Sequence, residues 1–366
     1  MASDFGKKVK ITIFGQSHSE AIGVVIDGLP VGEEIDLDAV QKFMERRAPG
    51  RNAYSTSRKE ADLPRVVSGL FEGKTCGAPI CAIIENTNTR SKDYDKLKDL
   101  PRPGHADFTA WVKYGGYNDH RGGGHFSGRI TAALVAAGAI IQMALEDKGI
   151  KIGSHITELH GAFDRTFENY ESDINLLSTR QFPVLSDKAE ERMREEIEKA
   201  AAKGDSVGGI LETAIVGIPA GVGEPWFDSV EGMLSHALFS IPAVKGVEFG
   251  LGFAFADTYG SEANDAFKMD GDRVVTETNN NGGINGGITN GMPILFRTVI
   301  KPTPSIFKEQ MSVSLSKKEN TILKIEGRHD PAIIHRARAV VDAVSALVVA
   351  DLLVGRYGTD YLVEKK

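Results

Sequence analysis

The sequence is poor in the features that mark specialised classes of protein. Its 366 residues include only two cysteines, Cys76 and Cys81, too few for a disulfide framework and without partners at metal-ligand spacing. The formal net charge of −7 argues against a general binder of nucleic acid or anionic membranes, which would need a positive surface. The first residues lack the apolar stretch and cleavage site of a secretory signal. We therefore expect a globular, cytoplasmic chain with no nucleic-acid or membrane partner.

Common catalytic and nucleotide-binding motifs are missing as well. The sequence has no phosphate-binding loop ending in Gly-Lys-Ser/Thr, no dinucleotide GxGxxG between strand and helix, and no GxSxG nucleophile elbow. A Ser-His-Asp hydrolase built on Ser17 or Ser127 is conceivable but lacks that elbow. His and carboxylate pairs do not recur at ligand spacing, so we expect no metal site.

The residues that are present indicate a mixed α+β chain. Apolar spacing predicts amphipathic helices within residues 36–50 and 186–204. Two further helices, Ile130–Leu145 and Pro331–Val354, are apolar nearly all round but are flanked or interrupted by charge, which favours a buried core over a membrane span. Runs rich in β-branched residues predict strands at 9–14, 23–28, 78–86, 208–219 and 293–301.

A short echo suggests an internal duplication. The stretches "GLPVG" at Gly28–Gly32 and "GIPAG" at Gly217–Gly221 each close a strand-like run, although five residues can match by chance. No linker or break in composition divides the chain, so we expect one domain over residues 1–366.

The stretch "RGGGHFSGR", residues 121–129, is the first candidate for a binding site. A glycine-rich loop that leads into a helix offers backbone N–H groups to an anion. The alternative is a tight turn in which Ser127 caps the helix. A second glycine-rich segment, residues 279–291, either approaches a ligand or is a loop.

Arginines are concentrated where a small polyanion could collect them. Their planar fork matches carboxylate and phosphate groups. For Arg46 and Arg47 the alternative is that cations in the last turn of a helix complement its dipole. The set comprises Arg46, Arg47, Arg51 and Arg58 in one segment, and Arg102, Arg121, Arg129 and Arg328 beside Gly, Pro or His.

Two loop motifs supply histidines for proton transfer near neutral pH. "FGQSHSE" contains Ser17 and His18, and "PRPGHAD" contains His105 in a Pro/Gly loop. A hydrogen-bonded structural role is the alternative for each. In "EGRHDPAII", Asp330 before Pro331 has the pattern of a helix start, which would by itself explain both residues.

Taken together, these stretches resemble the chorismate synthase family. The matching motifs occur in the family's order between residues 14 and 331: "FGQSHSEAIGVVIDGLPVG", "RPGHADFTAWVKYG", "RGGGHFSGRITAALVAAGAI", "GDSVGG", "GIPAGVGEPWFDS", "AVKGVEFG", "GGINGGITNG", "KPTPSI" and "GRHDP".

The resemblance implies an α+β sandwich with long helices packed between β-sheets, assembled as a homotetramer. It implies conversion of 5-enolpyruvylshikimate-3-phosphate to chorismate and phosphate, the last step of the shikimate pathway. The reaction is an anti 1,4-elimination that needs reduced FMN without net oxidation. Some family members also reduce FMN with NADPH, and the sequence does not say whether this chain does.

The same resemblance assigns roles to residues. His18 would assist the leaving phosphate as an acid, and His105 would stabilise the reduced flavin at N1. Ser17, Ser127 and Asp330 would form a proton relay near flavin N5. Substrate contacts are implied for Arg47, Arg51, Arg102, Arg129 and Arg328, and flavin contacts for His125, Phe126, Ser127, Ala243, Gly286, Lys301, Pro302, Thr303, Pro304, Ser305 and Arg328.

The chain also departs from the family pattern. His125 and Phe126 stand where many members have Arg and Ser, Pro242 where Asn is common, and Ala53 where Arg is frequent. Two other functions would use the same pocket: a flavin-dependent reductase, and a noncatalytic module that binds polyanions.

Overall fold

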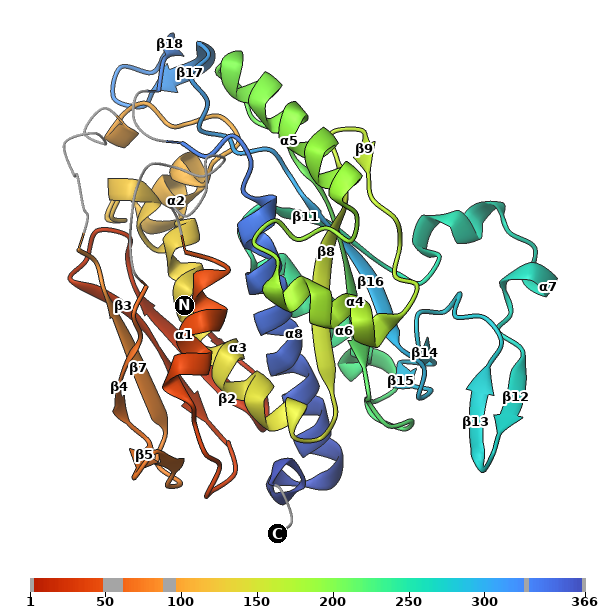
Figure 1. Ribbon diagram of the computed structural model, residues 1–366. Helices are drawn as coiled ribbons and strands as arrows, with labels where there is room; N and C mark the ends of the chain where they lie inside the picture. Colours follow the sequence, from red (N-terminus) through yellow and green to blue (C-terminus); the bar gives the residue numbers. More distant parts are fainter. Residues whose placement is uncertain (1–2, 49–61, 88–96, 326–328, 364–366) are drawn as a thin grey trace.

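Two antiparallel sheets flank the core of the molecule (Figure 1). The computed structural model describes residues 3–48, 62–87, 97–325 and 329–363, and within these ranges each of the two sheets has five strands. The first sheet has the order β1 (Asp4–Phe5), β2 (Lys10–Gly15), β3 (Ala21–Asp27), β7 (Ile80–Glu85) and β4 (Arg65–Ser68). The second has the order β11 (Val244–Phe249), β16 (Ile294–Ile300), β10 (Gly209–Val216), β8 (Lys151–Leu159) and β9 (Ala162–Phe163).

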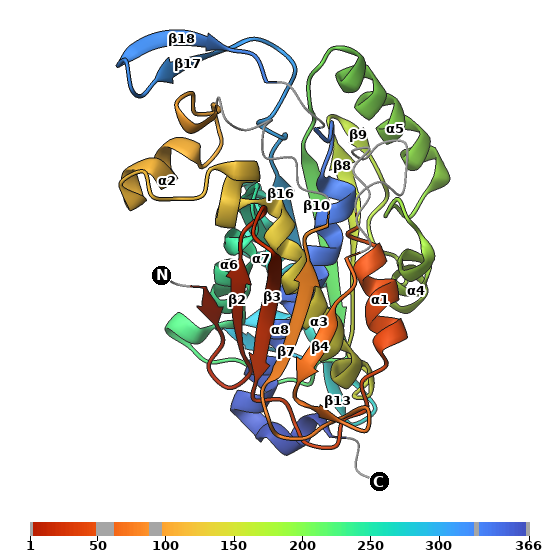
Figure 2. The same ribbon diagram turned by 90° about the vertical axis from the view of Figure 1, so that its left-hand side faces the viewer.

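Two long helices, α3 (Thr131–Glu146) and α8 (Ile334–Tyr357), lie between the sheets (Figures 1 and 2). Both are almost entirely buried, as their apolar composition predicts. Gly138 of α3 lets the helices approach, because a Cβ there would lie 2.2 Å from the Cβ of Ala343 in α8. By length and composition the segment Gly128–Glu146 could cross a membrane, but 89% of its apolar window is buried inside the fold. It is therefore a core helix.

Shorter helices complete the layers. Asp36 caps α1 as the sequence predicts, accepting hydrogen bonds from the N–H groups of Asp38 and Ala39. In α4, Ile174 packs against Gly153 of β8 on the outer face of the second sheet. The shorter helices are α1 (Leu37–Glu45), α2 (Asp107–Tyr114), α4 (Tyr170–Thr179), α5 (Asp187–Ala202), α6 (Val230–Ser240) and α7 (Gly260–Ala263), and the small hairpins are β5–β6 (Leu70–Phe71, Lys74–Thr75), β12–β13 (Phe267–Asp270, Arg273–Thr276), β14–β15 (Ile284–Asn285, Ile288–Thr289) and β17–β18 (Gln310–Ser314, Glu319–Leu323).

The sequence-based elements are largely confirmed, with one clear error. All five predicted strands are present, whereas β1, β4, β8, β9 and β11 of the two sheets and the strands of the small hairpins were not predicted. The predicted helix start at Asp330 and Pro331 is wrong: α8 begins at Ile334, and Ile333 at its N-cap makes no side-chain cap. The Asp330 carboxylate instead accepts a hydrogen bond from Arg336 at 2.6 Å, so an ion pair replaces the expected cap.

The turn at Gly28–Gly32 is held by a threonine from another strand. Thr75 Oγ1 donates to the carbonyl of Pro30 at 2.6 Å and accepts from the N–H of Glu33 at 2.9 Å. The N–H of Gly32 donates to the Thr75 carbonyl at 2.8 Å.

The turn at Gly217–Gly221 repeats this arrangement bond for bond. Thr289 Oγ1 donates to the carbonyl of Pro219 at 2.7 Å and accepts from the N–H of Val222 at 2.9 Å, and the N–H of Gly221 donates to the Thr289 carbonyl at 2.8 Å. Each threonine opens a Thr-x-Gly-x-Pro-Ile run, Thr75–Ile80 and Thr289–Ile294, which enters β7 and β16 respectively. The five-residue echo therefore marks two sheet–helix units, one with β2, β3, β7 and α3, the other with β8, β10, β16 and α8.

Candidate functional site

The predicted site residues converge at one end of both units. There β2, β7 and β16 end and α3 and α8 begin, in the upper part of Figure 1. The turns held by Thr75 and Thr289 lie at the opposite end of the strands. The site is therefore built from connections on one side of a shared frame.

The glycine triplet of residues 122–124 packs against two histidines that come from different loops. A Cβ on Gly122 would lie 2.5 Å from Cε1 of His18, and a Cβ on Gly123 would lie 3.1 Å from Cε1 of His105. Both glycines have positive φ, 59° and 83°. Only glycine therefore satisfies both the backbone conformation and the close approach of the rings.

Ser17 and His18 lie in the loop that follows β2. Their exposed fractions are 1% and 9%, so both side chains are buried. The N–H of Ser17 donates to the carbonyl of Gly124 at 3.0 Å. This bond ties the His18 loop to the glycine triplet.

His105 is oriented by a carboxylate. Its Nδ1 lies 2.6 Å from Oδ1 of Asp107, a distance at which Nδ1–H donates and Nε2 is left for other contacts. Arg102 donates three further hydrogen bonds to Asp107, from its backbone N–H at 3.0 Å and from its guanidinium at 2.8 and 2.9 Å. Burial opposes ionisation of Asp107, but the hydrogen bonds from Arg102 and His105 hold the pKa of that carboxyl well below its usual range.

The segment after β16 joins the same loop. Lys301 donates through Nζ to the carbonyl of Gly104, and Ser305 Oγ accepts from Arg102 at 3.2 Å. The N–H of Lys301 donates to the carbonyl of Ala243 at 2.9 Å. Ala243, Lys301 and Ser305, all implied flavin contacts, thus lie with Arg102 and the His105 loop. Pro304 is also adjacent, since a Cβ on Gly104 would meet its Cβ at 3.5 Å.

Arg47 and Arg129 share the carboxylate of Asp62. Arg47 Nη1 donates to Asp62 Oδ2 at 2.5 Å, and Arg129 Nη1 donates to Asp62 Oδ1. The exposed fraction of the side chain is 5% for Arg47, 4% for Arg129 and 0% for Asp62. The alternative in which Arg47 merely complements the dipole of α1 is wrong, because α1 ends at Glu45 and the Arg47 guanidinium is buried in an ion pair.

Burial and charge oppose each other within this cluster. Burial lowers the pKa of Arg47 to about 10, partly offset by Asp62. For Asp62, burial opposes ionisation, but Arg47 and Arg129 hold the pKa below its ordinary value. Arg336 extends the cluster: its Nε donates to the carbonyl of Arg47 at 2.8 Å and its Nη1 to Asp330. Asp330 is thereby linked to the arginine cluster.

His125, Phe126 and Ser127 have their side chains engaged within the chain. His125 Nδ1 lies 2.7 Å from the carbonyl of Gly15, and its Nε2 lies 3.1 Å from Ser3 Oγ. The Phe126 ring lies 6.1 Å from that of Tyr114. Ser127 Oγ accepts from the N–H of Arg129 at 3.3 Å, so the capping alternative for Ser127 holds for the short turn before α3.

Some predicted contacts lie apart or outside the described residues. Gly286 belongs to the turn of the β14–β15 hairpin near Ile294, whereas Lys301 follows the other end of β16. Six residue steps of a strand place these ends roughly 20 Å apart. The structure therefore does not bring Gly286 to the rest of the site. Arg51 and Arg328 lie outside the described residues.

Sequence reasoning missed three side chains that organise the site. Asp62 bridges two arginines, Asp107 orients His105, and Arg336 holds Asp330. Asp107 stands in the His105 motif and was visible as a neighbour in sequence. Asp62 and Arg336 belong to none of the motifs: Arg336 lies six residues after Asp330 within an apolar helix, and Asp62 lies 15 residues after Arg47 but 67 before Arg129.

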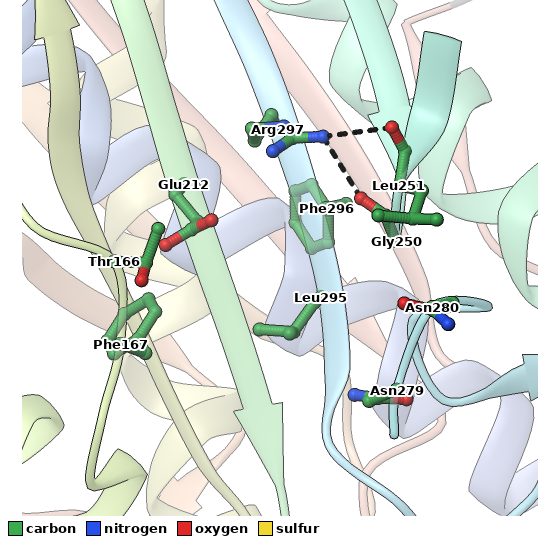
Figure 3. A pocket seen from close by; sticks show the side chains of 10 residues that line it. All are labelled: Thr166, Phe167, Glu212, Gly250, Leu251, Asn279, Asn280, Leu295, Phe296 and Arg297. Carbon is green, nitrogen blue, oxygen red and sulfur yellow. Dashed lines mark hydrogen bonds between the residues drawn. The ribbon is translucent and has the colours of Figure 1, made fainter. Parts of the chain in front are cut away.

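A hollow of about 200 Å³ lies elsewhere, on the outer face of the second sheet (Figure 3). It is lined by Thr166, Phe167, Glu212, Gly250, Leu251, Asn279, Asn280, Leu295, Phe296 and Arg297; Asn279 and Asn280 open the glycine-rich segment 279–291, and the other lining residues belong to no predicted site.

The charges around this hollow are paired across the strands. Glu212 lies 3.1 Å from Nε2 of His155, and Arg297 donates to Glu248 at 2.6 Å. Burial opposes the charge on His155, but Asp164 and Glu212 raise its pKa. The hollow is therefore separate from the predicted site at the histidine loops. Within the described ranges, no group of His, Cys, Asp and Glu side chains is arranged to hold a metal ion.

Comparisons with known proteins agree over nearly the whole chain. The family model described as chorismate synthase matches residues 9–354. The chorismate synthase of Thermococcus kodakarensis is 45% identical over 351 residues, covering 96% of this chain and 97% of that protein. That of Methanosarcina barkeri is 46% identical over 347 residues, covering 95% and 94%. A crystal structure of a chorismate synthase has a TM-score of 0.76 to this chain at 26% identity, covering 97% of this chain and 94% of that one.

Proposed function

The chain belongs to the chorismate synthase family and is a lyase of that kind; we propose that its reaction centre is the cluster around His18, His105 and Arg129. The substrate, 5-enolpyruvylshikimate-3-phosphate, loses its phosphate and the C6 hydrogen in an anti 1,4-elimination. The observation that carries this assignment is that Gly122 and Gly123 pack against both histidines next to buried arginines.

The residues present fit reduced FMN beside His105. Lys301 and Arg102 are cations suited to an anionic flavin or its phosphate: Arg102 lies on the loop that carries His105, and Lys301, which follows β16, donates to Gly104 of that loop. When bound, the reduced flavin supplies transient electron donation to the substrate without net redox change. His105, held through Nδ1 by Asp107, would have its Nε2 available to contact the flavin. Pro302 and Thr303 belong to the same proposed lining, and the Thr303 carbonyl is anchored by Ser206.

His18 is proposed as the acid that assists departure of the phosphate. Its burial beside Ser17 supports this, because exclusion of water strengthens the interaction of a proton donor with a leaving phosphate. Ser17, Ser127 and Asp330 are proposed to relay the proton taken from C6. Arg336 holds the Asp330 carboxylate in position for that role.

The carboxylates and phosphate of the substrate are proposed to bind the arginines. Arg47, Arg102 and Arg129 are each 6% exposed or less, so a substrate anion there would be largely desolvated. Arg51 and Arg328 are proposed to add to this set. A desolvated anion site explains how a chain of net negative charge can bind a polyanion.

A homotetramer is proposed as the working assembly. An arm that carries α7 and β12–β13 projects from the body and exposes Phe253, Tyr259 and Phe267 at 85%, 79% and 68% (Figure 1). Exposed aromatic side chains in such number are typical of an interface. Gly286, remote from Lys301 in its own chain, would reach a flavin only from a second copy. We further propose a cytoplasmic location and no nucleic-acid or membrane partner.

The decisive test is an anaerobic assay of phosphate release with chemically reduced FMN, repeated with NADPH and oxidised FMN. Phosphate release with reduced FMN alone establishes the elimination, and release in the second arm establishes flavin reduction as well. Flavin reduction without phosphate release would instead make the chain a reductase. Binding of the substrate without either reaction would make it a polyanion-binding module.

Arg129→Ala tests the substrate site directly. We expect weaker substrate binding by roughly 2–5 kcal/mol, because one partner of a desolvated charge pair is removed. Arg129→Lys should recover only part of the loss, since the planar fork is missing. Unchanged affinity in Arg129→Ala, measured by calorimetry, would refute the assignment.

A further inference from the structure

The Asp62 carboxylate occupies the place between two proposed substrate arginines. One of its oxygens accepts from Arg47 and the other from Arg129, and the Asp62 side chain is fully buried. Two guanidinium groups around one carboxylate form a binding geometry for an oxyanion. In this structure a group of the chain itself supplies that oxyanion.

Further donors of the two guanidiniums bind nearby hydroxyl, amide and carbonyl oxygens. Arg47 donates through Nε to Thr131 Oγ1 at 3.1 Å and through Nη2 to the carbonyl of Gly128 at 3.0 Å. Arg129 donates through Nε to Asn86 Oδ1 at 3.0 Å and through Nη2 to a backbone carbonyl. These contacts help to orient both forks beside Asp62. Asp62 is a negative charge that the two forks share.

A third cation, Arg336, lies next to Arg47. Arg336 donates a hydrogen bond to the carbonyl of Arg47, and its like charge contributes to lowering the pKa of Arg47. Arg336 is itself paired with Asp330, whereas without Asp62 the buried guanidiniums of Arg47 and Arg129 would lose the carboxylate that both contact. Buried charges of one sign are strongly destabilising unless a counter-ion is present.

We propose that Asp62 is an internal counter-ion, which holds the anion subsite of Arg47 and Arg129 in the free protein and gives way to an oxyanion of the substrate. The inference rests on the proposed function, since it assumes that these arginines bind substrate. The N–H groups that now bind Asp62 are the ones a substrate carboxylate or phosphate requires. Substrate binding therefore exchanges one counter-ion for another, and the affinity is limited by the strength of the internal pair.

The test is the variant Asp62→Asn in the full-length chain, with inorganic phosphate and acetate as probes. In buffer without oxyanions the variant should melt about 5 °C or more below the unmodified chain, because the arginines lose their counter-ion. Its affinity for the probe anion should rise at least about tenfold, equivalent to one factor of ten in the equilibrium constant. The arm that shows the gain, phosphate or acetate, identifies which group of the substrate the subsite takes. No gain in either arm overturns the proposal.

Two comparisons separate this role from a purely structural one. Asp173→Asn removes a carboxylate that is paired with Arg165 far from the site, so it should lower the melting temperature without a gain in anion affinity. Asp62→Glu keeps the charge and should restore the melting temperature with no such gain. Failure of Asp62→Asn to fold even in phosphate would also overturn the proposal, because an external oxyanion must be able to replace the missing carboxylate.

Turnover distinguishes failure of this inference from failure of the proposed function. Asp62→Asn should lower the KM for the substrate severalfold, whereas damage to the fold would lower kcat without lowering KM. If the unmodified chain turns over normally and the variant gains no anion affinity, only the counter-ion role fails. If the unmodified chain does not release phosphate from the substrate, the proposed function itself fails.

Discussion

The two sheet–helix units share the arrangement of three strands, one central helix and one turn, but they differ in the loops at the opposite end of the strands. Their turns repeat the same hydrogen bonds around Thr75 and Thr289, and both central helices start on the same side. In the first unit β2 stops at Gly15 and gives way to the loop of Ser17 and His18. In the second, the corresponding strand β8 continues to Leu159. The comparison shows that the two units share the strands, the central helix and the turn that form the frame. They differ in the loops that carry the predicted site residues.

The strongest test of this contrast is to replace a histidine at the same end of each unit. His18→Ala should lower turnover by about 10²–10⁴, the range for loss of a general acid. His160→Asn, at the exposed end of β8, should leave turnover within about twofold, because this position has diverged from the site. Both variants are measured in the anaerobic phosphate-release assay, with FMN binding as a check on the fold. Normal turnover in His18→Ala would return His18 to a structural role.

The central helices differ in their buried ionisable groups, which predicts a pH effect. In α8, burial raises the pKa of Asp342 to about 6, and burial lowers the pKa of His335 to about 4. The buried side chains of α3 include no ionisable group. Folded Asp342 binds more protons than the unfolded chain between about pH 4 and 6, so its contribution to stability falls as pH rises. His335 acts in the opposite sense, because its unfolded form binds more protons between about pH 4 and 6.5.

These opposing slopes should appear when one group is removed. In Asp342→Asn, the free energy of unfolding should rise from pH 4 to 6.5, relative to the unmodified chain, by on the order of 3 kcal/mol. In His335→Phe it should fall over the same range by a similar amount. Urea unfolding at half-unit pH steps measures both. Parallel pH profiles in the three proteins would contradict the assigned shifts.

The contact between the central helices gives a smaller effect. Gly138→Ala places a Cβ 2.2 Å from that of Ala343, so the free energy of unfolding should fall by about 1–3 kcal/mol through overpacking. Gly355→Ala is the matched control, since a Cβ there meets nothing within 4 Å on the exposed side of α8. It should stabilise by about 0.5–1 kcal/mol through helix propensity. Equal effects of the two substitutions would show that the close approach of the helices is not required.

The smallest effects test the repeated turns. Thr75→Val and Thr289→Val each remove a hydroxyl that donates one hydrogen bond and accepts another. Each should cost about 1–3 kcal/mol of unfolding free energy, and turnover should stay normal because the site lies at the opposite end. If the turns are equivalent, the two costs agree within about 0.5 kcal/mol. A clear difference in cost, or a loss of turnover in one variant, would break the equivalence of the units.

Local patterns predicted much of the framework. The strands at β2, β3, β7, β10 and β16 and the buried helices α3 and α8 are confirmed, because period and composition reflect burial directly. The start of α8 was wrong because an Asp-Pro pair looks like a cap, whereas the Asp330 carboxylate is taken by Arg336. Strands β1, β4, β8, β9 and β11 of the two sheets were missed.

The site was predictable only in part. The motifs identified His18, His105 and the glycine loop, and the structure brings these together. Asp62 was not predicted because its role depends on contacts with Arg47 and Arg129, which lie 15 and 67 residues away in the sequence. Gly286 is the opposite case: its motif implies a flavin contact, but within one chain the fold places Gly286 away from the other predicted flavin contacts.

By itself, the sequence determined the family, the α+β class and the residues available for chemistry, because these depend on local patterns and ordered motifs. Its five-residue echo also indicated the two turns, whereas the matching Thr-x-Gly-x-Pro-Ile runs gained significance only from the contacts of Thr75 and Thr289. Only the tertiary structure decided that both turns are the same, that Asp62 neutralises Arg47 and Arg129, and that Gly286 lies apart from Lys301. The physical reason is that hydrogen bonds and ion pairs act over a few ångströms, and the folded chain alone brings residues from distant segments within that range.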